Sequence, residues 1–185
     1  STPMAGRRDA VVAAAALIES VDHIARERSP QAVGTVGALT VSPNSQNTIA
    51  GHVELRVDMR HPDAQMMTEM DVVLRDSAAT IAEARNVVIN VDEIWYKPPV
   101  VFDTDCIASV REAAATLGYS HQNIVSGAGH DACQVCSVAP TAMIFVPCAG
   151  GLSHNEAESA KPEHLEAGCN VLLNAMVERS GVVES

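Results

Sequence analysis

Residues 51–60 alternate polar and apolar side chains without a break, and this segment constrains the fold more than any other. Its apolar members are Val53, Leu55, Val57 and Met59. A period of two is typical of a strand with one face against a core and the other face toward water. The chain is therefore expected to contain a sheet with one covered face.

Helical patterns precede and follow this strand. In residues 8–28 the apolar side chains recur at spacings of three and four, and Pro30 then stops the helix. A second helix opens at Pro62 and Asp63. Its expected apolar side consists of Met66, Met70, Val73, Leu74, Ser77, Ala78 and Ile81. Each helix thus has one apolar side with which it can cover a sheet.

Two more strands are expected, over residues 33–41, which are β-rich and uncharged, and over residues 87–95. The order within residues 8–97 is then helix, strand, strand, helix, strand. This order is one strand short of the split β-α-β-β-α-β unit, and the missing strand is expected before Ser1. We predict an antiparallel sheet with both helices on one face.

The pattern changes after Pro98 and Pro99, where we place a domain boundary. A helix is expected over residues 104–117, a short buried strand over residues 142–146, and a final helix with Pro162 near its first turn. The apolar stripe of the final helix is predicted to be Leu165, Gly168, Cys169, Leu172 and Met176. This order is typical of the last part of an α/β layer.

Charge and hydropathy exclude two classes of partner. Twelve Lys and Arg residues against 23 Asp and Glu residues give a net charge of −11, which repels nucleic-acid backbones and anionic membrane surfaces. The longest apolar stretch, residues 11–18, is much shorter than the ~20 residues that a membrane span needs. We therefore expect no nucleic-acid partner and no membrane partner.

The five cysteines are odd in number and scattered, which favours reduced thiols and a cytoplasmic location. Cys133 and Cys136 form a C-x-x-C pattern, which would suit a redox or zinc site. A second cysteine pair is missing, and residues 132–138 have the pattern of a helical turn. A thiol-based function is therefore a rival hypothesis.

His154 is the first candidate for a site residue. It lies in the polar, glycine-led loop 150–156, after the expected strand, where α/β layers assemble their sites. A neutral imidazole is a good zinc ligand, and a nearby carboxylate, of Glu156 or Glu158, can fix its tautomer. The alternative is a solvated loop histidine, since no cluster of His or Cys surrounds it in the sequence.

The turn that contains Gly127, Ala128 and Gly129 is the second candidate. Glycines before a helix expose backbone N–H groups that can hold an anion or a developing oxyanion. The alternative is a tight turn into a helix with Asp131 as the cap. The residues alone leave both interpretations open.

Arg60 is the third candidate, because it ends a strand in a chain that is short of positive charge. A guanidinium group is suited to clamp a carboxylate through two hydrogen bonds. Asn47, across a loop and a strand, would stand near Arg60 and add an amide. The alternative is a surface ion pair between Arg60 and Asp58 or Asp63.

In combination these stretches resemble the carbamoylase (hydantoinase/carbamoylase amidase) branch of the dizinc amidohydrolases. That branch includes N-carbamoyl-L-amino acid hydrolases, β-ureidopropionases and allantoate amidohydrolases. The resemblance rests on order and spacing more than on any single motif. The matching stretches are Ser1-Thr2-Pro3-Met4, Arg7-Arg8-Asp9-Ala10, residues 43–51 with Asn47, Asp58-Met59-Arg60-His61-Pro62, residues 126–132, and Leu152-Ser153-His154-Asn155-Glu156.

The resemblance implies a ferredoxin-like lid and dimerisation domain within an α/β catalytic domain. Residues 1–7 would then form the junction, residues 8–97 the lid, and residues 98–185 the C-terminal part of the metal-binding domain. The resemblance also implies two divalent metal ions, zinc or manganese, a homodimer formed through the lid, and a small anionic carbamoyl or ureido substrate. In relatives, lid residues can serve a site that is shared across the dimer.

The implied roles fall on residues named above. His154 would be the last metal ligand, Asn47 and Arg60 would bind the substrate carboxylate, and Gly127, Ala128 and His130 would line the substrate pocket. The family pattern also has a His-Ala-Gly before the segment that matches Ser1-Thr2-Pro3-Met4. That histidine, the other metal ligands and the Glu that serves as general base are absent from this sequence.

We therefore expect the intact protein to hydrolyse a carbamoyl or ureido C–N bond, and this chain alone to be inactive and to bind metal weakly. A dinuclear site needs several ligands, which one histidine cannot replace. The alternatives are a peptidase or aminoacylase of the same wider family and a non-catalytic homodimerisation module.

Overall fold

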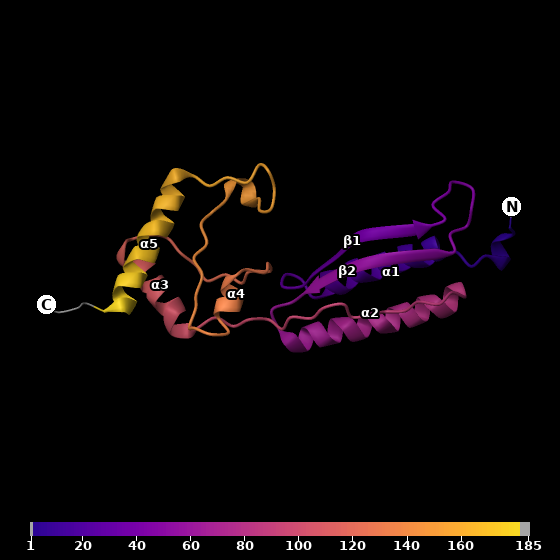
Figure 1. Ribbon diagram of the computed structural model, residues 1–185, viewed down its shortest axis with the longest axis horizontal. Coiled ribbons are helices and arrows are strands. Elements are labelled where there is room, and N and C mark those ends of the chain that lie inside the picture. Colours follow the sequence, from indigo (N-terminus) through magenta and orange to yellow (C-terminus); the bar gives the residue numbers. More distant parts are fainter. Residues whose placement is uncertain (1, 182–185) are drawn as a thin grey trace. The chain divides into compact units, whose positions relative to one another are not determined.

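The computed structural model describes residues 2–181, and the chain divides into two compact units, Ser1–Pro99 and Val100–Ser185 (Figure 1). Helices occur together with an antiparallel sheet, which confirms the predicted combination of these elements, an α+β fold. No helix within residues 2–181 has both the length and the apolar character that a membrane crossing requires.

The first unit contains one hairpin and two long helices. Its elements are the short 3-10 helix η1 (Met4–Gly6), α1 (Ala10–Glu27), β1 (Val33–Ser42), β2 (His52–Arg60) and α2 (Ala64–Arg85). β1 and β2 are antiparallel, with Val33 opposite Arg60 and Ser42 opposite His52. This order agrees with the predicted helix, strand, strand, helix succession.

Aspartates begin both long helices of the first unit. The carboxylate of Asp9 accepts hydrogen bonds from the first backbone N–H groups of α1, and Asp63 does the same for α2. These N–H groups have no partner within a helix, so a side-chain acceptor at this position stabilises the first turn. α2 ends at Asn86, whose left-handed conformation is common directly after a helix.

The core of the first unit lies between the hairpin and the two helices. Figure 1 shows α1 and α2 beside β1 and β2, and the same set of buried side chains joins them. Because Leu55, Val57 and Met59 of β2 all pack on this side, the predicted sheet with two helices on one face is confirmed. The fully or largely buried residues are Leu17, Val21, Ile24, Ala32, Met70, Leu74 and Ala78, and Val36, Leu55, Val57 and Met59 pack against them.

The prediction of a strand over residues 87–95 was wrong. The segment is extended but pairs with no strand, because β1 and β2 are the only sheet strands within the described residues. Ile89 and Val91 still pack against the core, and the carbonyl of Val91 accepts a hydrogen bond from Arg75 Nη1 at 2.8 Å. A backbone without a neighbouring strand has thus found a side-chain donor instead.

The second unit consists of helices and loops. Its elements are α3 (Thr104–Thr116), α4 (Ala132–Val135), the short 3-10 helix η2 (Ala149–Gly151) and α5 (Pro162–Ser180). The helix predicted over residues 104–117 matches α3 to within one residue. Pro162 lies in the first turn of α5, as predicted. The strand predicted over residues 142–146 does not form, since the described residues offer it no partner strand.

Small residues join α3 to α5. Ala113 and Ala114 of α3 are buried against Val171 and Ala175 of α5. The predicted apolar stripe of α5 was therefore wrong at its large members: Leu165 and Leu172 are each 50% exposed and Met176 is 61% exposed. Small side chains let the two helices approach closely, and that contact selects a different side of α5 from the one with the largest apolar residues.

A pair of glycines in β1 tests the close contact between the hairpin and α1. A Cβ at Gly34 would lie 3.1 Å from both the Ala25 Cβ and the Val21 carbonyl oxygen, whereas a Cβ at Gly37 meets nothing within 4 Å. We expect Gly34→Ala to lower the free energy of unfolding by about 1–3 kcal/mol, because strand and helix must separate. Gly37→Ala, the control at the register irregularity of the same strand, is expected to change it by less than about 0.5 kcal/mol.

Urea titration followed by circular dichroism measures both variants. Equal stabilities of the Gly34 and Gly37 variants would contradict this close contact.

Candidate functional site

The structure places Asn47 and Arg60 at opposite ends of the hairpin. Asn47 lies in the loop between β1 and β2, which Figure 1 shows beyond one end of the two strands. Arg60 is the last residue of β2 and stands opposite Val33. A strand rises about 3.3 Å per residue, so the nine residues of β2 separate its ends by about 26 Å. The prediction that Asn47 stands near Arg60 was wrong within one copy of the chain, because this strand is fully extended.

Arg60 forms a bidentate ion pair with Asp58. Arg60 Nε donates to Asp58 Oδ1 at 2.9 Å, and Arg60 Nη2 donates to Asp58 Oδ2 at 2.7 Å. The hydrogen bonds from Arg60 hold the pKa of Asp58 below its usual range. About half of each side chain remains exposed, at 48% for Arg60 and 54% for Asp58. A carboxylate ligand of Arg60 would therefore compete with Asp58.

Ser126 organises the turn that contains Gly127, Ala128 and His130. The N–H of Ala128 donates to Ser126 Oγ at 3.2 Å, and the Nε2 of His130 lies 2.8 Å from the same oxygen. The ring of His130 also meets Phe145 edge to face, with centroids 5.5 Å apart. The turn thus brings Ala128 and the imidazole of His130 to one hydroxyl group. Ser126 and Phe145 were not among the predicted site residues.

The short helix α4 follows this turn without the expected cap. Asp131 makes no side-chain hydrogen bond to α4, so the cap in one of the two open interpretations of this turn does not form, and Ser126 accepts a hydrogen bond within the turn. Cys133 in α4 and Cys136 directly after it are free thiols. Cys136 Sγ lies 3.7 Å from the carbonyl oxygen of Val101.

His154 lies on the exposed loop between η2 and α5, and its backbone is unusual. Its φ angle is +55°, in the left-handed region that residues with a Cβ rarely adopt. Its N–H donates to Glu158 Oε2 at 2.8 Å. The carboxylate that the sequence suggested as a partner of the imidazole therefore binds the backbone of His154, and not its ring. Neither ring nitrogen makes a hydrogen bond to another residue in the described part of the chain.

The donor set decides how far these residues fit a metal site. Among residues 2–181, no three side chains of His, Cys, Asp or Glu are grouped so that they could hold a metal ion. His154 fits a single ligand position, because its imidazole is exposed and both ring nitrogens are uncommitted. The described residues therefore do not complete a dinuclear metal site by themselves.

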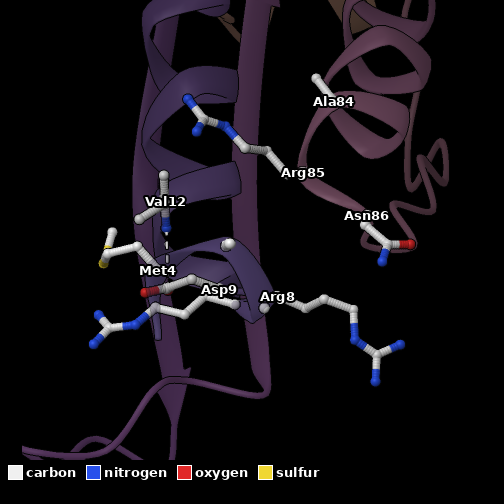
Figure 2. A pocket seen from close by; sticks show the side chains of 10 residues that line it. Met4, Arg8, Asp9, Val12, Ala84, Arg85 and Asn86 are labelled. Carbon is white, nitrogen blue, oxygen red and sulfur yellow. Dashed lines mark hydrogen bonds between the residues drawn. The ribbon is translucent and has the colours of Figure 1, made fainter. Parts of the chain in front are cut away.

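A cleft of about 370 Å³ in the first unit lies between the start of α1 and the end of α2. Arg7, Arg8, Arg85 and Asn86 are among its lining residues, but none of the predicted site residues is. Figure 2 shows the side chains of Arg8 and Arg85 extending in different directions. The Nε of Arg7 donates to the carbonyl of Thr2 at 2.9 Å. The guanidinium groups of Arg8 and Arg85 therefore do not point to one position where they could clamp an anion together.

Comparison with known proteins identifies the family. The family model described as peptidase family M20/M25/M40 matches residues 5–178. An N-carbamoyl-L-amino-acid amidohydrolase of Rhizobium meliloti is 46% identical over 184 residues, which are 100% of this chain and 44% of that protein. An allantoate amidohydrolase of Escherichia coli is 30% identical over 172 residues, 93% of this chain and 42% of that protein.

A solved structure gives the same result for the fold. The crystal structure of an amidase of the hydantoinase/carbamoylase family from Burkholderia multivorans is 50% identical, with a TM-score of 0.90 over 96% of this chain and 43% of that one. The chain belongs to the peptidase family M20/M25/M40. It spans less than half the length of these relatives.

The ion pair at the end of β2 gives a testable pKa. Arg60→Gln removes the hydrogen bonds that lower the pKa of Asp58, so this pKa is expected to rise toward the ordinary value of about 3.9. Arg56→Gln is the matched control, because Arg56 pairs with Glu54 on the same strand and its loss is expected to leave Asp58 unchanged. NMR titration of the Asp58 carboxyl carbon measures the shift.

The same pair contributes to stability in a defined pH range. The pKa of Asp58 is lower in the folded chain than in the unfolded chain, so the pair stabilises the fold above about pH 4 and this contribution is lost as the pH falls through the folded pKa. Because both side chains are half exposed, its size is about 0–1 kcal/mol. An unchanged pKa of Asp58 in Arg60→Gln would show that another group lowers it.

Proposed function

We propose that the whole protein is a metal-dependent amidohydrolase that cleaves a carbamoyl or ureido C–N bond and releases ammonia, carbon dioxide and a free amine. The observation that carries this proposal is the 46% identity to an N-carbamoyl-L-amino-acid amidohydrolase along the entire chain. The similarity to this relative makes an N-carbamoyl amino acid the first candidate substrate of the whole protein. β-Ureidopropionate and allantoate are substrates of the same chemistry.

Arg60 and Asn47 are proposed to bind the substrate carboxylate. Arg60 presents a guanidinium that already holds a carboxylate, that of Asp58, through two hydrogen bonds. Asn47 can add an amide N–H. The length of β2 keeps the two residues apart in one copy, so both can contact one small substrate only if they come from two copies. This geometry supports a homodimer with a site shared between subunits.

The turn at residues 127–130 is proposed to line the pocket. Gly127 and Ala128 would offer backbone groups to the ureido end of the substrate, and His130 would offer its imidazole. Ser126 and Phe145 restrict how the His130 ring can turn, because Ser126 contacts its Nε2 and Phe145 packs against the ring in a T-shaped pair. A restricted ring presents Nδ1 in a fixed direction, which favours binding of a substrate in one orientation.

His154 is proposed to be a metal ligand of the whole protein. Two divalent ions, zinc or manganese, would supply Lewis acidity toward the substrate carbonyl and lower the pKa of a nearby water. Since residues 2–181 do not complete such a site, the remaining ligands and the general base are proposed to lie in the part of the protein that this chain does not span. Metal identity and the cytoplasmic location stay predictions.

The domain assignment follows from these roles. Residues 8–97 are proposed to be the lid and dimerisation domain, residues 1–7 its junction, and residues 98–185 the C-terminal part of the catalytic domain. The covered hairpin of the first unit and the helices and loops of the second unit support this division.

Turnover of a panel of substrates tests the reaction. The whole protein is expected to release ammonia from an N-carbamoyl-L-amino acid, and to act weakly or not at all on a dipeptide. His154→Ala is expected to lower kcat/KM by more than about 100-fold, because a metal ligand is lost. His121→Ala, a change of another exposed histidine of the second unit, is the control and is expected to keep full activity. Turnover of the dipeptide alone would favour the peptidase alternative.

Mixing two inactive variants tests the shared site. Asn47→Ala and Arg60→Ala are each expected to lower activity strongly when they form homodimers. A mixed dimer has one site that combines the intact Asn47 of one subunit with the intact Arg60 of the other, and a second site that lacks both residues. Since half of the dimers are mixed after equal mixing, about a quarter of wild-type activity is expected to return. Activity is measured after the subunits have exchanged.

No restoration in dimers shown to have exchanged would contradict the shared site. Mixing each variant with itself is the control, and it is expected to change nothing.

A further inference from the structure

The loop that carries His154 is closed at its base. Cys148 and Ala160 form an isolated antiparallel bridge, and the N–H of Ala149 donates to the carbonyl of Ser159 at 2.7 Å. The two ends of the exposed loop 149–159 are therefore held together. A closed loop of this kind can fix a side chain only if bonds inside the loop also fix the backbone.

Inside the loop, the backbone of His154 needs such a bond. Its φ of +55° is a conformation that costs free energy for a residue with a Cβ. Strained backbone of this kind persists where surrounding groups hold it, and it is common at functional sites. The neighbouring Gly150 and Gly151 also have positive φ, but glycine adopts that conformation without strain.

Glu158 supplies the bond. Its Oε2 accepts the hydrogen bond of the His154 N–H at 2.8 Å, and its own N–H donates to the carbonyl of Asn155 at 2.9 Å. Asn155 Oδ1 in turn accepts from the N–H of Ala157 at 2.9 Å. Glu158 thus ties the loop with both its side chain and its backbone. A hydrogen bond to a charged carboxylate is stronger than one between neutral groups.

We propose that Glu158 is a positioning residue for His154. By holding the strained backbone of His154, it directs the imidazole out of the loop and leaves both ring nitrogens uncommitted. This inference rests on the proposed function, in which His154 is a metal ligand. Glu158 itself would not be a ligand, because Oε2 is engaged with the His154 N–H and Oε1 lies 3.8 Å from Cys148 Sγ.

Zinc binding by the whole protein tests the inference with three variants of the loop. Glu158→Ala removes the acceptor and is expected to lower the affinity for the zinc ion that His154 binds by about 10-fold or more. Glu158→Gln keeps an oxygen acceptor and is expected to retain affinity within a few-fold of wild type. Glu156→Ala is the matched control, because it removes the same charge from the same loop and Glu156 makes no hydrogen bond there. Competition with a chromophoric chelator measures the affinities.

Two results would overturn the positioning role. Wild-type zinc affinity in Glu158→Ala would show that zinc binding does not depend on the hydrogen bond between the His154 N–H and Glu158. Equal losses in Glu158→Ala and Glu158→Gln would show that the negative charge matters and the hydrogen bond does not.

Amide hydrogen exchange of His154 in the metal-free protein provides an independent readout. The exchange is expected to be faster in Glu158→Ala than in Glu156→Ala, and equal rates would overturn the claim that Glu158 holds this backbone. His154→Ala separates the two proposals. If it binds zinc as the wild type does, the metal-ligand role in the proposed function has failed, whereas the exchange rates still decide whether Glu158 holds His154.

Discussion

Burial of one face of the β1–β2 hairpin by α1 and α2 is the interaction on which the first unit depends. Met70 and Ile24 are completely or almost completely buried in that layer. Because this layer holds β1 and β2 as an extended antiparallel pair, the loop with Asn47 and the strand end with Arg60 are kept about 26 Å apart. The same packing that stabilises the unit therefore prevents one copy from using both residues on one small molecule.

Much of this fold could be predicted from the sequence, because helix caps, proline stops and the alternation in residues 51–60 are local signals. The extended segment at residues 87–95 could not, since side-chain pattern does not reveal whether a backbone has a strand to pair with. The side of α5 that packs against α3 could not be predicted from the sequence either. Ala113, Ala114 and Ala175 are less apolar than Leu165 or Leu172, yet their small size permits the close contact between α3 and α5.

The candidate site was predictable in part. Asp58 was recognised as a possible partner of Arg60, and two bonds join them. The role of Ser126 was not recognised, because a hydroxyl that holds both Ala128 and His130 has no spacing signature. The hydrogen bond that the His154 N–H donates to Glu158 could not be predicted either, since a left-handed φ at a histidine is not encoded in any short motif. Local chemistry thus names candidate residues, but their partners follow from the fold.

His154 with its supporting loop is proposed to be one part of a metal site that the whole protein completes. The most direct measurement is the zinc content of the isolated chain and of the whole protein after identical dialysis. The whole protein is expected to keep two ions and the isolated chain to lose its zinc, because no three ligand side chains are grouped within residues 2–181. Stoichiometric zinc retained by the isolated chain would contradict it.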